Sequence, residues 1–326
     1  MKRVFSIIAS LSLLTLVACS SNPGSSGNDS GDKKYTVGVS QLVQHPALDA
    51  ATQGFVDTLK EEFGDSVEVD VKNASGQTDV CSTIANQFIT DGVDLIMANA
   101  TPALQAAASS TGDIPILGTS ITEYGVALEI ADFNGTVGGN VSGTSDLAPL
   151  DEQAALFDEL LPEAKTIGIL YCSSEANSKY QVEVVQKELE AKGKTVNLYP
   201  FTDSNDVGTF TQNAVNECDA LYIPTDNTAA SCTETINNIA FPAGVPIIAG
   251  EEGICKGCGI ATLSINYYDL GVTTGKMAIE ILKNGKDVST MPIEYFSNPE
   301  KKYFKERAEA LNITIPSDYV EIEVGE

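Results

Sequence analysis

The sequence is poor in the residues that most often carry catalysis. It contains one histidine, His45, so a Ser-His-Asp triad would have to be built around that residue. No G-x-G-x-x-G opens a helix after the first predicted strand and no G-x-x-x-x-G-K-[ST] occurs, which argues against nucleotide chemistry. These absences disfavour an enzyme and make the binding of a solute the better hypothesis.

Basic residues and tryptophan are also scarce. The sequence has 19 Lys and Arg against 45 Asp and Glu, and the resulting net charge of -26 argues against nucleic acids and anionic lipids as partners. Tryptophan is absent and aromatic residues make up 7%, so a sugar site built on stacked rings is less favoured. The 43% of hydrophobic residues still suffice for one or two buried cores.

The amino-terminal part is predicted to lie outside the folded protein. Two basic residues precede an apolar run, residues 4–17, that is too short for a comfortable membrane span. The run leads into Leu-Val-Ala-Cys19, which resembles a bacterial lipobox, so we expect residues 1–18 to be a signal peptide and Cys19 to carry lipid. Residues 19–33 are rich in Ser, Gly and Asn and are typical of a flexible tether. We therefore expect an extracytoplasmic chain, lipid-anchored to the cell membrane, with an ordinary secretory peptide as the alternative.

The stretch 220–231, ALYIPTDNTAAS, combines a short buried strand with polar residues at the start of a helix. In an open parallel α/β sheet such strand ends face the crevice that binds ligands, so Asp226 and Asn227 are candidate binding residues. Capping of the following helix is the alternative role. The stretch 94–102, DLIMANATP, repeats this layout earlier in the chain. Because the repeat is far longer than that of a solenoid, we predict two similar domains with a cleft between them.

Strands and helices are predicted to alternate along both halves of the chain. Short apolar runs indicate strands, and apolar residues at helical spacing indicate the helices between them. This β-α-β order predicts an α/β protein with two doubly wound parallel-sheet lobes joined by a multi-strand hinge. Helices are also expected at 229–239 and around 300–311. The predicted lobes are 34–144 plus 266–291 and 145–265 plus 292–326.

Two of the six cysteines that follow Cys19 form a Cys-x-x-Cys pair, Cys255 and Cys258. Such a pair can be a redox couple, half of a zinc site or a staple of a small loop. A metal site is disfavoured because no second Cys-x-x-Cys exists and His45 lies over two hundred residues away. Three neighbouring glycines favour a turn over a helix, so we expect a surface loop, either bridged or free. No metal and no cofactor are expected.

Six stretches spread over residues 35–316 carry a family resemblance: GVSQLVQHPALDAATQGF, GTSD, ILYCSSEANS, IPTDNT, AGEEG and NYYDLGVTTGKMA. Together they resemble the tryptophan/tyrosine-type ABC transporter substrate-binding lipoproteins, which have the type I periplasmic-binding-protein fold. The chain departs from that pattern at Cys172, where Asn is expected, and in the Cys255–Cys258 loop. The resemblance implies a receptor, not an enzyme, that closes two lobes on a small solute and presents it to a membrane permease. An aromatic L-amino acid is the implied solute.

A free amino acid needs three kinds of contact in such a cleft. Its carboxylate needs hydroxyls and free backbone N–H groups at a helix start, a role that suits Thr101, Ser173, Ser174, Thr119 and Ser120. Its ammonium needs a carboxylate, because an unpaired buried charge costs several kcal/mol; Asp226 is our first choice, followed by Glu251 and Glu175. The predicted ligand-binding residues are Gln41, Leu42, Asn99, Thr101, Thr119, Ser120, Ser173, Ser174, Glu175, Asn177, Thr225, Asp226, Asn227, Glu251 and Tyr267.

The side chain of the solute needs an apolar or aromatic surface, for which Leu42, Tyr124 and Tyr267 or Tyr268 are candidates. His45 is expected to order its loop rather than to contact the solute. Other hypotheses stay open at this point: a branched-chain amino acid, nucleoside or sugar as the solute, a sensor without a transport role, or an enzyme on the same scaffold. We expect a monomer.

Overall fold

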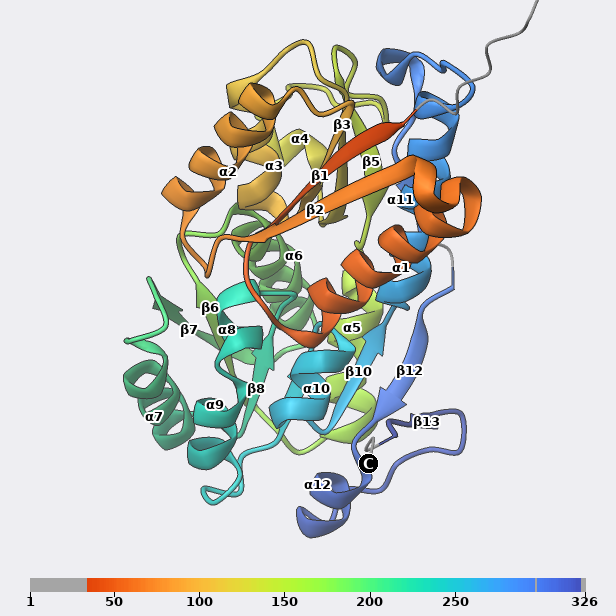
Figure 1. Ribbon diagram of the computed structural model, residues 1–326. Coiled ribbons are helices and arrows are strands. Elements are labelled where there is room, and N and C mark those ends of the chain that lie inside the picture. Colours follow the sequence, from red (N-terminus) through yellow and green to blue (C-terminus); the bar gives the residue numbers. More distant parts are fainter. Residues whose placement is uncertain (1–33, 297, 324–326) are drawn as a thin grey trace, which may run out of the picture. The chain divides into compact units, whose positions relative to one another are not determined.

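A computed structural model describes residues 34–296 and 298–323, so the expected signal peptide, the lipidation site Cys19 and the tether lie outside the described residues. The described chain forms two β-sheets with helices packed on them (Figure 1). None of its helices combines the length and apolar character needed to cross a membrane.

The first lobe is built on a six-stranded sheet. Its elements are β1 (Tyr35–Gln41), α1 (Pro46–Phe63), η1 (Gly64–Ser66), β2 (Val67–Asn73), α2 (Thr78–Asp91), β3 (Leu95–Asn99), α3 (Thr101–Ser110), β4 (Ile116–Ile121), α4 (Tyr124–Ala127), β5 (Val141–Ser145), α11 (Tyr267–Leu282), η2 (Val288–Thr290) and β11 (Glu294–Tyr295). The strand order is β11-β5-β4-β3-β1-β2, and every neighbouring pair is parallel. Helices α1 and α11 pack on one face, and α2 and α3 on the other.

The second lobe is built on a seven-stranded sheet. Its elements are α5 (Leu150–Leu160), β6 (Thr166–Cys172), α6 (Ala176–Ala191), β7 (Thr195–Phe201), α7 (Val207–Glu217), β8 (Ala220–Ile223), α8 (Asn227–Ser231), α9 (Thr233–Ala240), β9 (Ile247–Ala249), α10 (Glu252–Cys258), β10 (Ala261–Ser264), β12 (Glu300–Tyr303), α12 (Lys305–Ala310) and β13 (Val320–Glu321). The strand order is β13-β12-β10-β9-β8-β6-β7. Strand β12 runs antiparallel to β10, whereas the remaining pairs are parallel.

The chain passes between the sheets three times: after β5, between β10 and α11, and between β11 and β12. The predicted fold class, two parallel-sheet α/β lobes with a multi-strand hinge, is confirmed. The last crossing falls later than the boundary at residue 292 that we expected. Strand β11 pairs with Thr144 and Ser145 in the first sheet, so this crossing lies between Tyr295 and Glu300.

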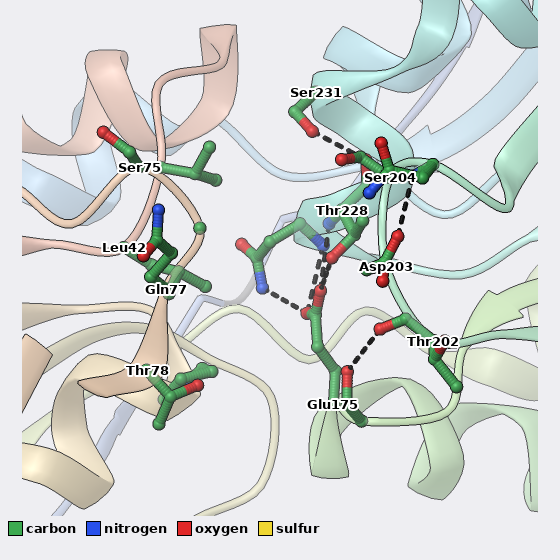
Figure 2. Close-up of a pocket in the computed structure, with 16 residues that line it drawn as sticks. Leu42, Ser75, Gln77, Thr78, Glu175, Thr202, Asp203, Ser204, Thr228 and Ser231 are labelled. Carbon is green, nitrogen blue, oxygen red and sulfur yellow. Dashed lines mark hydrogen bonds between the residues drawn. The ribbon is translucent and has the colours of Figure 1, made fainter. Parts of the chain in front are cut away.

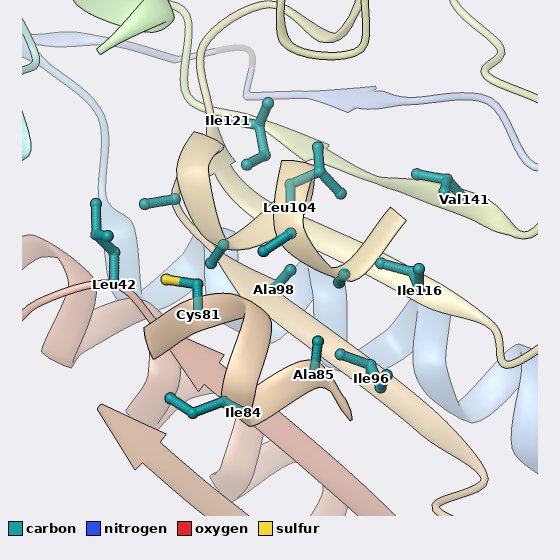
Figure 3. Packing of buried hydrophobic residues seen from close by; sticks show 14 of the residues in the cluster. Leu42, Cys81, Ile84, Ala85, Ile96, Ala98, Leu104, Ile116, Ile121 and Val141 are labelled. Carbon is teal, nitrogen blue, oxygen red and sulfur yellow. The ribbon is translucent and has the colours of Figure 1, made fainter. Parts of the chain in front are cut away.

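The core of the first lobe shows why the predicted strands and helices form. Leu104 of α3 lies over Ile96 and Ile116 of the sheet, all fully buried (Figure 3). A Cβ atom at Gly38 in β1 would lie 2.6 Å from the ring of Phe88 in α2, so glycine there lets the ring lie flat on the strand. Burial of such side chains contributes about 1.5–3 kcal/mol each.

Helices α1 and α11, which lie side by side in Figure 1, touch through glycines. A Cβ atom at Gly271 would lie 2.0 Å from the carbonyl oxygen of Ala51, and one at Gly275 would lie 2.7 Å from Thr58 Cβ. Gly54 of α1 meets the backbone of α11 in the same way. This close contact fixes the helix that begins directly after the second crossing.

The Cys-x-x-Cys stretch is not the surface loop that we predicted, because Glu252–Cys258 form helix α10 and both cysteines are buried. The glycines misled the prediction. A Cβ atom at Gly257 would lie 2.3 Å from the hydroxyl oxygen of Thr233, so this glycine permits contact with helix α9 instead of making a turn. Burial raises the pKa of Cys258 to about 12, which is the opposite of a reactive redox thiol.

Buried Arg307 holds the carboxyl end of α10. Its Nε donates to the carbonyl oxygen of Gly259 at 2.8 Å, and one terminal nitrogen donates to that of Cys255 at 2.6 Å. The guanidinium carbon lies 3.9 Å from the centre of the Phe304 ring. A cation at this place offsets the partial negative charge of the helix end.

Two other predicted elements differ from the structure. Residues 300–311 contain strand β12 before helix α12, because Lys302 and its neighbours pair with β10. The predicted helix 229–239 is divided between α8 and α9 at Cys232. The six described cysteines are unpaired; Cys232 is partly exposed, and Cys81, Cys172, Cys218, Cys255 and Cys258 are buried.

Candidate functional site

Loops that follow the strands of both sheets surround a pocket of about 340 Å³ (Figure 2). Residues of the first lobe in its wall are Leu42, Val43, Ser75, Gly76, Gln77, Thr78 and Pro102. The second lobe contributes Ser174, Glu175, Thr202, Asp203, Ser204, Asn205, Asn227, Thr228 and Ser231. Four of the predicted ligand-binding residues therefore line it: Leu42, Ser174, Glu175 and Asn227.

The carboxylate of Glu175 organises the second-lobe side of this pocket. It accepts hydrogen bonds from both the backbone N–H and the side chain of Asn227, at 3.1 and 2.6 Å, and from the same two groups of Thr228, at 2.9 and 2.8 Å. Asn177 donates a fifth, at 3.1 Å. Glu175 thus occupies the amino end of α8, and Figure 2 shows its side chain directed at Thr228.

Asp226, our first choice as ammonium partner, is buried and already satisfied by three donors. Its Oδ2 accepts from Cys172 N at 2.6 Å and from Ser178 Oγ at 2.7 Å, and its Oδ1 accepts from Ala229 N at 2.8 Å. The last bond makes it the N-cap of α8. Burial and, next, the neighbouring Glu175 carboxylate raise the pKa of Asp226 to about 7.

Asn177 and Thr225 connect the starts of α6 and α8. The Asn177 side-chain nitrogen donates to the carbonyl oxygen of Thr225 at 3.1 Å, and Gln181 both donates to that oxygen and accepts from Thr225 N. The carbonyl oxygen of the Asn177 side chain has no partner in the protein.

The two predicted serines after β6 bind the neighbouring strand end. Ser173 Oγ donates to Phe201 O and Ser174 Oγ to Thr202 O, both at 3.0 Å. Cys172, the departure from the family pattern, lies 2.9 Å from Ser174 Oγ and is fully buried. These hydroxyls hold the β6 and β7 loops together at the pocket.

Gln41 and Asn99 bring β1, β3 and α1 together. Thr52 Oγ1 donates to Gln41 Oε1 at 2.6 Å and accepts from Asn99 Nδ2 at 3.0 Å. Asn99 Nδ2 also donates to the carbonyl oxygen of Leu48. Asn99 Oδ1 is buried without a partner, so one face of this amide is unused by the fold.

Thr119 lies in a buried cluster of three hydroxyls. Its Oγ1 is 3.2 Å from Thr144 Oγ1 and 3.1 Å from Thr274 Oγ1, and the latter two are 2.8 Å apart. This cluster joins β4, β5 and α11 within the first lobe. Its neighbour Ser120 is different, because the Ser120 hydroxyl is buried and unpartnered.

Two neighbouring strand ends carry residues in the left-handed region, Ala100 with a φ of 89° and Ser120 with a φ of 55°. Residues other than glycine adopt such angles at a cost and are concentrated at functional sites. Ala100 directly precedes α3, whose first residue, Thr101, is buried. The backbone N–H groups at the start of this ten-residue helix can bind an anion.

Asp146, which sequence reasoning missed, lies where the chain leaves β5. Tyr267 OH donates to its Oδ2 at 2.9 Å, and its Oδ1 is buried without a partner. Burial raises the pKa of Asp146 to about 6. Glu251, in the second lobe, caps α10 by accepting from Gly253 N and Ile254 N, and burial raises its pKa to about 7. The position of Asp146 at the end of the GTSD motif, directly after strand β5, was the signal available in the sequence.

Two of the proposed aromatic contacts lie elsewhere. Tyr124 fills a slot left by Gly118 and Gly143 in the sheet and donates from its hydroxyl to Thr144 O at 3.0 Å, so it belongs to the core. Tyr268 is 40% exposed, and its hydroxyl donates to Asp57 on the outside of α1. Tyr267 and Leu42 remain as the candidates near the strand ends.

His45 connects the lobes. Its Nε2 lies 3.3 Å from Oδ1 of Asn227, so the loop before α1 touches the start of α8. The other ring nitrogen of His45, Nδ1, belongs to a group of buried side-chain atoms that have no hydrogen-bond partner within the described protein. These atoms are Ser40 Oγ, His45 Nδ1, Asn99 Oδ1, Ser120 Oγ, Asp146 Oδ1, Asn177 Oδ1 and Thr262 Oγ1.

The charges near the strand ends are predominantly negative. Four buried carboxylates lie there: Asp146, Glu175, Asp226 and Glu251. Among the described residues, Arg307 is the only buried Lys or Arg. It lies at the opposite end of α10 from Glu251. The described part of the chain holds no group of three or more His, Cys, Asp or Glu arranged for a metal ion. The site can therefore accept hydrogen-bond donors and a cation.

Comparisons with known proteins identify relatives of this chain. The chain is 36% identical over 309 residues to a tyrosine-binding protein of Clostridioides difficile (strain R20291), which covers 92% of this chain and 89% of that protein. It is similar to the solved ABC domain in complex with L-Trp from Streptococcus pneumonia, with a TM-score of 0.84, 36% identity, and 87% and 97% of the two chains covered. It is also similar to the ligand-free, open structure of a substrate-binding protein with adhesive properties from Clostridium difficile, with a TM-score of 0.66, 38% identity, and 89% and 100% covered.

The family model described as ABC transporter substrate binding protein matches residues 36–322. Proteins of this family bind solutes rather than transform them; those of ABC importers work outside the cytoplasm and together with a membrane permease. The expected resemblance is confirmed. The chain belongs to the ABC transporter substrate-binding proteins and has their type I periplasmic-binding-protein fold.

Proposed function

We propose that this chain captures an aromatic L-amino acid between its two lobes and delivers it to the permease of an ABC importer. The observation that carries the proposal is a set of buried, unpartnered polar atoms in both lobes, together with four buried carboxylates for which the described residues supply no Lys or Arg partner. Two relatives support the solute class, since one is named for tyrosine and the other was solved with L-Trp.

The ammonium group would be held by Asp146. Both oxygens of Asp226 and of Glu175 already accept hydrogen bonds, whereas Asp146 Oδ1 is free. The other carboxylates strengthen the negative potential around this place. A buried ammonium needs such a partner, because leaving it unpaired costs several kcal/mol. Asp226 would then contribute at longer range, as the cap of α8.

The carboxylate group would bind at the start of α3. Thr101 and the following backbone N–H groups lie there, and the free hydroxyl of Ser120 is on the neighbouring strand end. A helix of ten residues has a partial positive charge at this end, which favours an anion. This arrangement would let the fold bind a carboxylate although the described cleft contains no buried lysine or arginine.

The pocket of about 340 Å³ suits an aromatic side chain in size. Pockets for small molecules begin at about 300 Å³ and combine apolar walls with a few polar groups. Leu42, Val43 and Pro102 provide the apolar wall here, and Ser174, Glu175 and Asn227 provide polar groups.

The solute is tested by calorimetry on the tag-free domain that starts at Lys34. L-tyrosine, L-tryptophan and L-phenylalanine should bind, and at a thousandfold excess over Kd each should add about 4 kcal/mol to the free energy of unfolding. Tyramine, which lacks the carboxylate, and 3-(4-hydroxyphenyl)propionate, which lacks the ammonium, are the matched controls and should bind at least tenfold more weakly. Binding of a sugar or of leucine in preference to all three aromatic amino acids would overturn the proposal.

We further propose that residues 1–18 are removed and that Cys19 carries lipid, which leaves a monomer tethered to the membrane by residues 19–33. The support is the lipobox-like Leu-Val-Ala-Cys19 sequence. Labelling of cells with a radioactive fatty acid should mark the wild-type protein and not the Cys19→Ser variant. Equal labelling of both would contradict this assignment.

A further inference from the structure

Hydrogen bonds fix the orientation of the Asn227 side chain. Apart from the Asn227 side chain, Glu175 accepts from the backbone N–H groups of Asn227 and Thr228 and from the Thr228 hydroxyl, so its carboxylate acts as an acceptor. The side-chain group of Asn227 that lies 2.6 Å from Glu175 Oε2 must therefore be the NH2 group, Nδ2. As a result, the other end of this amide, Oδ1, is an acceptor that faces away from Glu175.

This orientation fixes the tautomer of His45. The atom 3.3 Å from Asn227 Oδ1 is His45 Nε2, and because Oδ1 can only accept, Nε2 must carry the proton. A neutral imidazole has one protonated nitrogen, so Nδ1 is left with a free lone pair. Hydrogen bonds link Glu175 to Asn227 and Asn227 to His45. Two residues of the second lobe thus make Nδ1 of His45, on the first lobe, a hydrogen-bond acceptor.

The Nδ1 atom is buried and has no hydrogen-bond partner in the protein. His45 as a whole is 6% exposed, so bulk water does not satisfy this nitrogen. Burial also lowers the pKa of His45; the Asn227 hydrogen bond and the carboxylates of Glu175 and Asp49 act in the opposite direction. The ring is therefore kept neutral, and an unsatisfied buried acceptor costs about 1–3 kcal/mol unless a donor reaches it.

We propose that His45 is a specificity-determining residue whose Nδ1 accepts a hydrogen bond from the captured solute. This inference rests on the proposed function. In an aromatic L-amino acid the donor is either the ammonium or the polar hydrogen of the ring, which tyrosine has on its phenol and tryptophan on its indole. Phenylalanine lacks the second kind. In both cases the solute donates a hydrogen bond to the neutral Nδ1 atom. This inference replaces our expectation that His45 orders its loop rather than contacting the solute.

The single histidine of the sequence makes a direct test possible. In a ¹⁵N-labelled, tag-free domain from Lys34, the two imidazole nitrogens of His45 are unambiguous in long-range ¹H–¹⁵N spectra. Nε2 should show the resonance of a protonated nitrogen and Nδ1 that of an unprotonated one. On saturation with L-tyrosine the Nδ1 resonance should move in the direction of hydrogen bonding. A shift with L-tyrosine and not with L-phenylalanine identifies the phenol as the donor, and a shift with both identifies the ammonium.

A protonated Nδ1, or an Nδ1 resonance unmoved by every aromatic amino acid that binds, would overturn the inference. The proposed function would be untouched, since calorimetry on the same sample shows whether these amino acids bind at all. Failure of all three to bind would instead remove the proposed function.

Variants separate the solute contact from the contact between the lobes. His45→Phe removes both, whereas Asn227→Ala removes the contact between the lobes, together with an amide in the pocket wall, and leaves the His45 imidazole in place. If the phenol is the donor, His45→Phe should weaken L-tyrosine about 3- to 10-fold more than L-phenylalanine, the value of one neutral hydrogen bond. If the ammonium is the donor, His45→Phe should weaken both amino acids, and by 3- to 10-fold more than Asn227→Ala does. Equal losses for both variants and both amino acids would leave His45 with a structural role and refute the inference.

Discussion

Tyr267 donates a hydrogen bond of 2.9 Å to Asp146, a residue 121 positions earlier in the chain. The two residues belong to separate crossings between the lobes, since Asp146 follows β5 and Tyr267 begins α11. The second oxygen of the same carboxylate is buried and has no hydrogen-bond partner in the described protein. If Asp146 holds the solute as proposed, contact with the solute and the geometry of the hinge meet in one side chain, which is where ligand-driven closure needs a connection.

Tyr267→Phe should destabilise the protein by about 1–3 kcal/mol, because it leaves a buried carboxylate oxygen without its donor. The free energy of unfolding from urea titrations measures the effect. The neighbouring Tyr268→Phe is a matched control, since its hydroxyl binds exposed Asp57 and the change should cost less than about 1 kcal/mol. Equal effects of the two changes would contradict the importance of the Asp146 contact.

Asp146→Asn should weaken L-tyrosine about 10- to 100-fold, the value of a charged hydrogen bond to a buried ammonium. The Asn side chain can still accept from Tyr267, so the fold should be kept. Calorimetry at pH 7.5 measures the loss, and an unchanged Kd would assign the ammonium to another group.

The affinity of the wild-type protein for L-tyrosine should also fall when the pH is lowered. Because the pKa of Asp146 is about 6 in the free protein, the group is mostly protonated at pH 5 and the ammonium loses its charged partner. Binding of L-tyrosine should be about tenfold weaker at pH 5 than at pH 7. The Asp146→Asn variant should show little of this dependence, and a wild-type affinity independent of pH would argue against the assignment.

Without solute, the free energy of unfolding should rise when the pH is lowered, whereas the affinity falls. Burial raises the pKa of Asp226 and Glu251 to about 7 and that of Asp146 to about 6, above their ordinary values near 4. Between pH 8 and pH 5 the folded state therefore binds more protons than the unfolded chain, so the free energy of unfolding rises on acidification. Denaturant titrations without solute at pH 8, 6.5 and 5 test this. Falling stability over that range would mean that other groups dominate.

Gly271→Ala should be strongly destabilising, because its Cβ would lie 2.0 Å from the carbonyl oxygen of Ala51 and must push α11 away from α1. Overpacking of this kind costs about 1–3 kcal/mol or more. Gly112→Ala is the matched control, since no atom lies within 4 Å of the added carbon. Thermal unfolding of both variants measures the loss of stability. An unchanged melting temperature for Gly271→Ala would show that α1 and α11 can move apart at no cost.

Much of the fold could be predicted because its signals are local. A buried parallel strand such as Leu95–Asn99 is a short apolar run, and the polar residues after it are found at the strand end. Residues such as Glu175 and Asn227 were placed near the pocket for that reason. Their orientations could not be predicted, because four of the five hydrogen bonds of Glu175 come from Asn227 and Thr228, which are distant in the sequence.

Other features escaped because they depend on distant contacts. Gly257 signals a turn when considered alone, and the contact with Thr233 that explains it lies outside any local pattern. Asp146 resembles an ordinary loop residue until Tyr267 is placed beside it. Tyr124 is an aromatic residue near a strand end, yet Gly118 in β4 and Gly143 in β5 open a slot for it inside the lobe.

The burial of the thiols has a practical consequence. Within the described part of the chain, Cys232 is the partly exposed cysteine, and the remaining five are buried. A maleimide fluorophore should therefore label the native, untagged domain at one position without mutagenesis. That position follows α8, whose opposite end supplies Asn227 and Thr228 to the pocket. An environment-sensitive dye attached there would turn the domain, with its wild-type sequence, into an optical biosensor.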